Sequence, residues 1–225
     1  NKNLKIKIVP DVGGIWLSDM FMRIKESDAY DKKFVMICGN PNPCTYLPLA
    51  ALINMHRVNL RNVYPFMMDE WADDQGNIAP LTYRSGFTYS FMKYFYEQVD
   101  PELRMPVKNI HYFTNENVAH YSDILEEVGE GGADAIYSGP GWAGHIAFID
   151  PCPELIPDYR EGGTYEIKNL DDPYFTQKAQ IVTLHPLTIA QNSLHGVFGC
   201  SGNIGNVPPK AATIGPRDVL HSRFK

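Results

Sequence analysis

The residue types best suited to acid–base chemistry form two groups in the sequence. Asp69 and Glu70 directly follow the apolar run at 63–68, and His145 is followed five residues later by Asp150. A carboxylate that bonds one nitrogen of an imidazole fixes its tautomer and raises its basicity, so His145 and Asp150 are candidates for a proton-transfer pair. The carboxylates at 69 and 70 are either a base at the end of a strand or caps of the next helix.

A glycine-rich segment stands directly before His145. Gly139, Gly141 and Gly144 match the letters G-x-G-x-x-G, a pattern that indicates dinucleotide binding only where the glycines open a long helix. Here the apolar letters HIAFI follow at once and predict a strand, so we favour a tight loop that lets backbone approach a ligand. Trp142 in this loop is either a core residue or a platform on which a sugar ring stacks.

The composition indicates one folded domain, 1–225. Of the 225 residues 44% are hydrophobic and 20% charged, which is enough apolar side chain for a core. The formal net charge of −6 disfavours nucleic acid and anionic membranes as partners. The sequence has no apolar run of the ~20 residues that span a bilayer and no signal-peptide core at its start, so we expect a cytoplasmic location.

Four cysteines are present, at positions 38, 44, 152 and 200. Their spacing matches no zinc site and no C-x-x-C redox motif. A domain of this size without an export signal has little use for a disulfide framework. We therefore expect four reduced thiols.

Apolar runs alternate with helix-period segments, which predicts an α/β fold with a mostly parallel sheet. We expect helices at about 11–27, 47–55, 84–99 and 117–130, and strands at 4–9, 34–39, 63–68, 109–113, 133–139, 145–149 and 180–185. Because ligands bind beyond the carboxyl ends of parallel strands, the residues that follow each strand matter most. The Pro-, Gly- and charge-rich segment at 153–178 predicts a long loop or lid.

The order of several motifs resembles that of the glucosamine-6-phosphate deaminases, which are also called isomerases. The motifs are MDE at 68–70, YSFM at 89–92, GxGxxGHIAF ending in Asp150-Pro151, TIAQNS at 188–193 and the stretch 207–215. The resemblance runs from about Phe34 to Leu220. It implies a modified Rossmann-like three-layer fold with a mostly parallel sheet, and it implies no metal or organic cofactor.

The resemblance also implies a chemistry. A histidine helps open the sugar ring, and an aspartate moves a proton between C2 and C1 through an enolamine-type intermediate. Ammonia is then released, and a ketose phosphate remains. His145 matches the histidine, Asp69 matches the aspartate, and Asp150 stands where the family has a glutamate that supports the histidine. Further substrate contacts are expected from Asn40, Asn42, Thr45, Glu70, Gly139, Gly141, Trp142, Gly144 and Lys210. By analogy we expect a sugar or sugar phosphate as ligand and a homo-oligomer.

Several positions depart from the family pattern. Ala143 replaces an acidic residue, Leu194 replaces a phosphate-clamping arginine, and two prolines stand in the phosphate turn at 40–45, where each removes an N–H donor. The family continues past residue 225 with a phosphate-contacting lysine, so Lys210, Arg217 or the segment at 153–178 would have to replace the clamp. A changed substrate, a non-catalytic sugar-binding protein and a hydrolase related to the 6-phosphogluconolactonases stay open as alternatives.

Overall fold

The computed structural model describes residues 8–142, 144–150 and 171–225. Its centre is a parallel sheet with the strand order β2-β1-β4, made of β1 (Phe34–Cys38), β2 (Val63–Met67) and β4 (Ala135–Tyr137). β1 and β4 are buried at every position, as their continuous apolar sequence predicts for a sheet covered on both faces. Pro65 lies in β2, an edge strand, where its missing N–H donor is tolerated.

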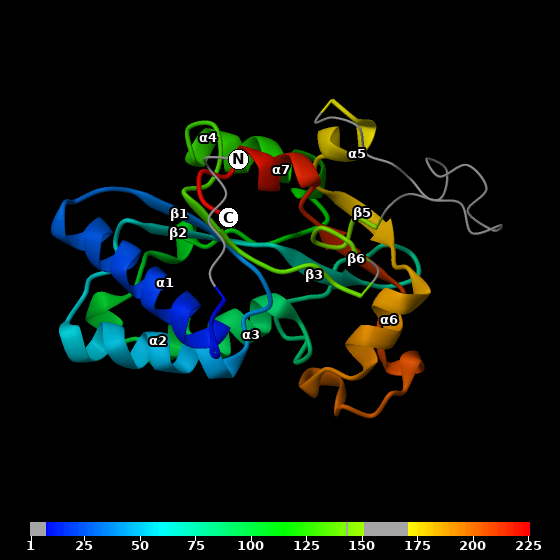
Figure 1. Cartoon of the computed structure of the whole chain (residues 1–225), viewed down its shortest axis with the longest axis horizontal. Helices are drawn as coiled ribbons and strands as arrows, with labels where there is room; N and C mark the ends of the chain where they lie inside the picture. The colour runs from blue at the N-terminus through cyan, green and yellow to red at the C-terminus, as the bar shows by residue number, and fades with distance from the viewer. Residues whose placement is uncertain (1–7, 143, 151–170) are drawn as a thin grey trace.

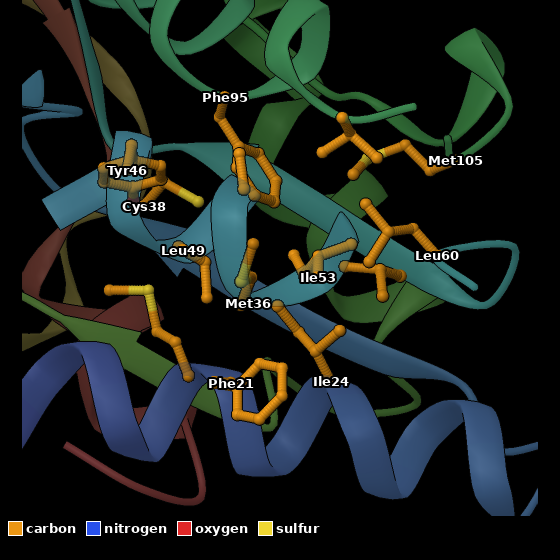
Figure 2. Packing of buried hydrophobic residues seen from close by; sticks show 14 of the residues in the cluster. Phe21, Ile24, Met36, Cys38, Tyr46, Leu49, Ile53, Leu60, Phe95 and Met105 are labelled. Atoms are coloured by element: carbon orange, nitrogen blue, oxygen red, sulfur yellow. The ribbon is translucent and has the colours of Figure 1, made fainter. Parts of the chain in front are cut away.

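Helices cover both faces of this sheet, which confirms the expected Rossmann-like α/β fold in three layers (Figure 1). One face carries α1 (Val12–Ala29), α2 (Pro43–His56) and α3 (Phe87–Tyr94), and the other carries α4 (Tyr121–Val128) and α7 (Pro216–His221). Figure 2 shows the first of these interfaces, where Phe21 and Ile24 of α1 and Leu49 and Ile53 of α2 surround Met36 of β1.

A second sheet is antiparallel and begins where the first one ends. Its strands are β3 (Asp69–Ala72), β5 (Gln180–Thr183) and β6 (Lys210–Thr213), in the order β3-β6-β5. β3 begins two residues after the last residue of β2, so Asp69 lies at the rim of the parallel sheet and pairs with Thr213 in the antiparallel one. Parallel pairing therefore describes the first sheet, whereas β3 and β6 are strands that the sequence did not indicate.

The remaining helices are short. They are α5 (Pro173–Thr176), α6 (Pro186–Ser193) and the 3-10 helices η1 (Tyr96–Gln98), η2 (Pro101–Leu103), η3 (Val107–Asn109), η4 (Val118–His120), η7 (Gly196–Phe198) and η8 (Ile204–Asn206). The helix predicted at 84–99 forms as α3 followed by η1, and the one predicted at 117–130 forms as η4 followed by α4. Asp11 is the N-cap residue of α1, although its side chain makes no capping hydrogen bond.

Two predicted strands are wrong. Residues 109–113 contribute one bridge, from His111 to Phe66, and their first residue belongs to η3. Residues 145–149 form a tight turn that is closed by hydrogen bonds between Ile146 and Ile149, with Ala147 at a φ of 53°. Both runs are apolar because they are buried, and periodicity in five residues does not separate a buried strand from a buried turn.

Some sequence-based predictions fall outside the described residues. These are most of the strand at 4–9, the alanine at 143 and most of the loop or lid at 153–178. The described end of that last segment contains α5, whose first turn is capped by the Asp172 side chain on the Tyr174 N–H.

Two expectations drawn from composition can be compared with the structure. Cys38 is buried, Cys44 and Cys200 are exposed, and all three are free thiols, as expected, while Cys152 lies outside the described residues. Among the residues that the structure describes, no helix combines the length and the apolar composition that a bilayer crossing requires.

Candidate active site

A cavity of about 430 Å³ opens at the carboxyl ends of β1 and β4, beside the first residue of β3. This is the edge at which ligands bind in parallel α/β sheets. The residues that line it are Trp16, Gly39, Asn40, Asn42, Met68, Asp69, Phe87, Tyr137, Ser138, Gly139, His145, Ala147, Phe148, Gln191, Asn192, Leu194 and His195. Asp69 and His145, which are 76 positions apart in the sequence, thus face one cavity.

Asp69 is a buried carboxyl group with one strong hydrogen-bond donor. The Thr213 hydroxyl donates to Oδ1 over 2.5 Å, because the two residues are direct cross-strand partners in β3 and β6. Burial raises the pKa of Asp69 to about 7, and the Thr213 hydrogen bond and the nearby His145 limit that rise. A carboxyl group with this pKa both accepts and returns a proton near neutral pH.

His145 is held by groups behind it. Its Nδ1 lies 3.0 Å from Thr188 Oγ1 and 3.3 Å from Asp150 Oδ1, and the Thr188 hydroxyl donates to the same Asp150 oxygen over 3.4 Å. Because the Thr188 hydrogen is used on the carboxylate, we assign the imidazole proton to Nδ1. The lone pair then lies on Nε2, so His145 can act as a base.

The turn at 146–149 makes this arrangement possible. It reverses the chain between Ile146 and Ile149, which brings Asp150 back to the imidazole five residues before it. A strand over the same residues would have carried the two side chains apart, since each strand residue advances by ~3.3 Å.

The close approach of Gly141 to His145 explains the glycine-rich segment better than nucleotide binding does. A Cβ atom built on Gly141 would lie 2.1 Å from His145 Nε2, so only glycine allows the chain to pass the reactive nitrogen. Gly144 has a φ of 75°, a conformation that glycine adopts without strain. Gly139 lines the cavity but has open space around it.

A hydrogen-bonded chain joins the carboxyl group of Asp69 to the backbone of the turn that follows His145. The Phe148 N–H donates to Thr213 Oγ1 over 3.0 Å, and Thr213 in turn donates to Asp69. Thr213 therefore connects the turn that carries His145 to the carboxyl group of Asp69. Thr188 and Thr213 lie in stretches that the sequence analysis singled out, yet no role was predicted for either hydroxyl.

Some of the other predicted substrate contacts line the cavity and others do not. Asn40 and Asn42 line the cavity, and the Asn42 side chain also caps α2 by accepting the Thr45 N–H over 3.0 Å. The Asn40 amide lies 2.7 Å from Nε2 of His195, which lines the cavity as well. Thr45 itself is buried behind Asn42. Gln191 and Asn192 of α6 are cavity residues that the sequence analysis did not propose.

Besides Thr45, Gly141 and Gly144, three further predicted contacts are outside the cavity lining. Glu70 accepts the backbone N–H groups of Trp71, Phe87 and Thr88, so its carboxylate caps the start of α3, the second role considered for it. Trp142 is 62% exposed and does not pack in the core. Lys210 is at the opposite end of β6 from Thr213, paired with Ala72.

Neither of the cations considered as a replacement clamp reaches the cavity. Arg217 donates to Glu126 over 2.7 Å and Lys210 does not line the cavity, whereas Leu194 does. No lysine or arginine from the described ranges 8–142, 144–150 and 171–225 is among the lining residues. Within those ranges no group of three or more His, Cys, Asp or Glu side chains could hold a metal ion.

Sequence comparison places this site in a known context. No family model matches the chain. The glucosamine-6-phosphate deaminase of Dictyostelium discoideum is 26% identical over 213 residues, which cover 92% of this chain and 66% of that protein. The enzyme of the same name from Caenorhabditis elegans is 25% identical over 207 residues, which cover 88% of this chain and 65% of that protein. Over most of its length the chain is thus similar to proteins named glucosamine-6-phosphate deaminase.

Two solved structures share the fold of this chain. A monomeric glucosamine-6-phosphate deaminase superposes with a TM-score of 0.66 at 20% identity, over 92% of this chain and 74% of that one. A 6-phosphogluconolactonase from Thermotoga maritima superposes with a TM-score of 0.55 at 14% identity, over 96% and 79%. The chain spans slightly less than two thirds of the length of its curated relatives.

Proposed function

We propose that this chain acts on an amino sugar by ring opening and proton transfer between C1 and C2, followed by loss of ammonia. One observation carries the proposal: Asp69, with a pKa of about 7, faces the same cavity as His145, whose Nδ1 is held by Thr188 and Asp150. An aldose–ketose shift needs a carboxylate at the α-carbon and a second acid–base group at the ring oxygen. The similarity to enzymes named glucosamine-6-phosphate deaminases supports it.

Each residue has one task in the proposed reaction. His145 Nε2 takes the proton of the anomeric hydroxyl and returns it to the ring oxygen, which opens the ring. Asp69 removes the proton from C2 while the C1 oxygen takes one from water, giving an enolamine. Asp69 then returns its proton to C1 while the nitrogen gives one back to water. The resulting imine at C2 is hydrolysed by water to a ketose and ammonia. Asp150 and Thr188 keep the His145 lone pair on Nε2.

The test is release of ammonia from amino sugars by the purified chain. We expect turnover that falls by about 10²-fold or more in Asp69→Asn and in His145→Gln, because each variant removes one proton-transfer group. Asp74→Asn and His120→Gln make the same chemical changes at exposed positions away from the cavity and should retain activity. Absence of turnover on every amino sugar, or full activity of Asp69→Asn, would contradict the proposal.

A second candidate is hydrolysis of a sugar lactone, which the free Nε2 of His145 favours because it could activate water. The shared fold with a 6-phosphogluconolactonase is consistent with it. Lactone hydrolysis needs the imidazole but not a carboxyl group at the α-carbon, so it should survive in Asp69→Asn and fail in His145→Gln. A non-catalytic sugar-binding protein would instead show a sugar-dependent thermal shift, unaffected by His145→Ala, without any product.

A sugar or sugar phosphate is thus the ligand class that we propose. The homo-oligomeric state, the cytoplasmic location, and the absence of nucleic-acid and membrane partners stay predictions from the sequence.

A further inference from the structure

The charge of the cavity bears on which sugar it accepts. Lysine and arginine are absent from the described lining residues, so the side chains there that can carry charge near neutral pH are Asp69, His145 and His195. Burial lowers the pKa of His195, which keeps its imidazole neutral at pH 7. A phosphate dianion placed here would thus meet a carboxyl group and no fixed cation, and burying an unpaired charge is unfavourable.

The start of α2 offers little to an anion either. Helix N-termini bind phosphate through free backbone N–H groups. In α2 the first residue is Pro43, which has no N–H, and the N–H of Thr45 is already bonded to the Asn42 side chain over 3.0 Å. The Asn42 carbonyl accepts the N–H of Tyr46 as well. Most backbone N–H groups of the first turn of α2 are therefore absent or already hydrogen-bonded within the chain.

Neutral amides take the place of cations in this cavity. Gln191 accepts the Trp142 N–H through Oε1 over 2.7 Å, which leaves its amide hydrogens as donors. Asn192 donates to the Thr188 carbonyl over 2.8 Å, which leaves its Oδ1 as an acceptor. Asn40 is held by His195 across the cavity lining. Each amide is oriented by a fixed partner and presents a group that a sugar hydroxyl can bond.

We propose that the substrate of this site is an unphosphorylated amino sugar, whose hydroxyl groups are recognised by the amides of Asn40, Gln191 and Asn192. The choice of an amino sugar rests on the proposed function, whereas the preference for a neutral over a phosphorylated ligand rests on the cavity lining alone.

Binding tests this preference without turnover. Calorimetry on the Asp69→Asn chain would compare D-glucosamine with glucosamine 6-phosphate at low and high salt. This variant removes the acidic group of the cavity, so any bias that it introduces favours the phosphate. We expect the unphosphorylated sugar to bind at least as tightly, with little dependence on salt. Tighter binding of the 6-phosphate by about tenfold, weakened by salt, would overturn the proposal, as would failure to bind either sugar.

A gain-of-charge pair sharpens the comparison. Leu194, the C-cap residue of α6, lines the cavity, whereas Leu187 lies in the first turn of α6 and outside the lining; the two side chains are about equally exposed, at 49% and 50%. Leu194→Arg should shift the affinity ratio toward the 6-phosphate by about tenfold or more, and Leu187→Arg should leave it unchanged. If the ratio of the two affinities were unchanged in both variants, the proposal that this part of the cavity lining contacts the sugar would be overturned. Tight binding of D-glucosamine without ammonia release by the wild-type chain would leave this inference standing and contradict the proposed function.

Discussion

Replacing Thr213 with valine should change the protonation behaviour of Asp69 while preserving the shape of the core. The Thr213 side chain is fully buried, and its single hydroxyl hydrogen has two acceptors within reach, Asp69 Oδ1 at 2.5 Å and the Ile214 carbonyl at 3.2 Å. The shorter contact goes to the carboxylate, and the Thr213 hydroxyl oxygen itself accepts the Phe148 N–H. Valine has nearly the same volume but neither donates nor accepts, so both partners lose a bond that water does not replace.

The size of the effect follows from these contacts. A hydrogen bond to a charged group contributes about 1.5–3 kcal/mol, and one pKa unit corresponds to about 1.4 kcal/mol. The Thr213 hydroxyl stabilises the ionised form of Asp69, so its loss should raise the pKa from about 7 by about 1–2 units. Since the base must be ionised, and about half of it is ionised at pH 7 in the wild-type chain, activity at pH 7 should fall by about 5- to 50-fold and recover at higher pH.

The assay is the pH dependence of kcat/KM for the wild-type chain, Thr213→Val and Thr213→Ser. The midpoint of the acid limb should move upward in the valine variant and stay near the wild-type value in the serine variant, which keeps the hydroxyl group. A purely structural role for Thr213 would lower kcat/KM equally at every pH. An acid limb with the wild-type midpoint in Thr213→Val would refute the reasoning.

Three further predictions concern neighbouring groups. Folded Asp69 keeps its proton up to about pH 7, whereas an unfolded aspartate ionises near ~3.9. The wild-type chain should therefore lose about 2–3 kcal/mol of unfolding free energy relative to Asp69→Asn between pH 5 and pH 8, as measured by urea unfolding. Parallel curves of stability against pH for the two chains would disprove this. Gly141→Ala should lower kcat by about 10²-fold, since its Cβ would lie 2.1 Å from His145 Nε2, whereas Gly196→Ala, with open space around it and outside the cavity lining, should act as wild type. Glu70→Ala should cost about 2–4 kcal/mol of unfolding free energy, because three N–H groups lose their acceptor, and an unchanged urea midpoint would argue against that role.

The sequence alone determined the elements that have a strong local signal. The run FVMIC predicted β1 because five successive apolar side chains require burial on both faces of a sheet. The helix period between 11 and 27 predicted α1, and Met20 and Ile24 of that pattern lie on its buried face. The sequence also indicated that Asp69 and His145 come after predicted strands. This position places both at the ligand-binding edge of a parallel sheet.

Only the tertiary structure decided how those residues work. The apolar run after His145 folds as a turn, and that turn brings Asp150 and Thr188 to Nδ1. Asp69 meets Thr213, which is 144 positions away, because two strands pair in a sheet that no local pattern indicated. Burial by distant segments, which leaves no local trace in the sequence, is also what raises the pKa of Asp69 to about 7.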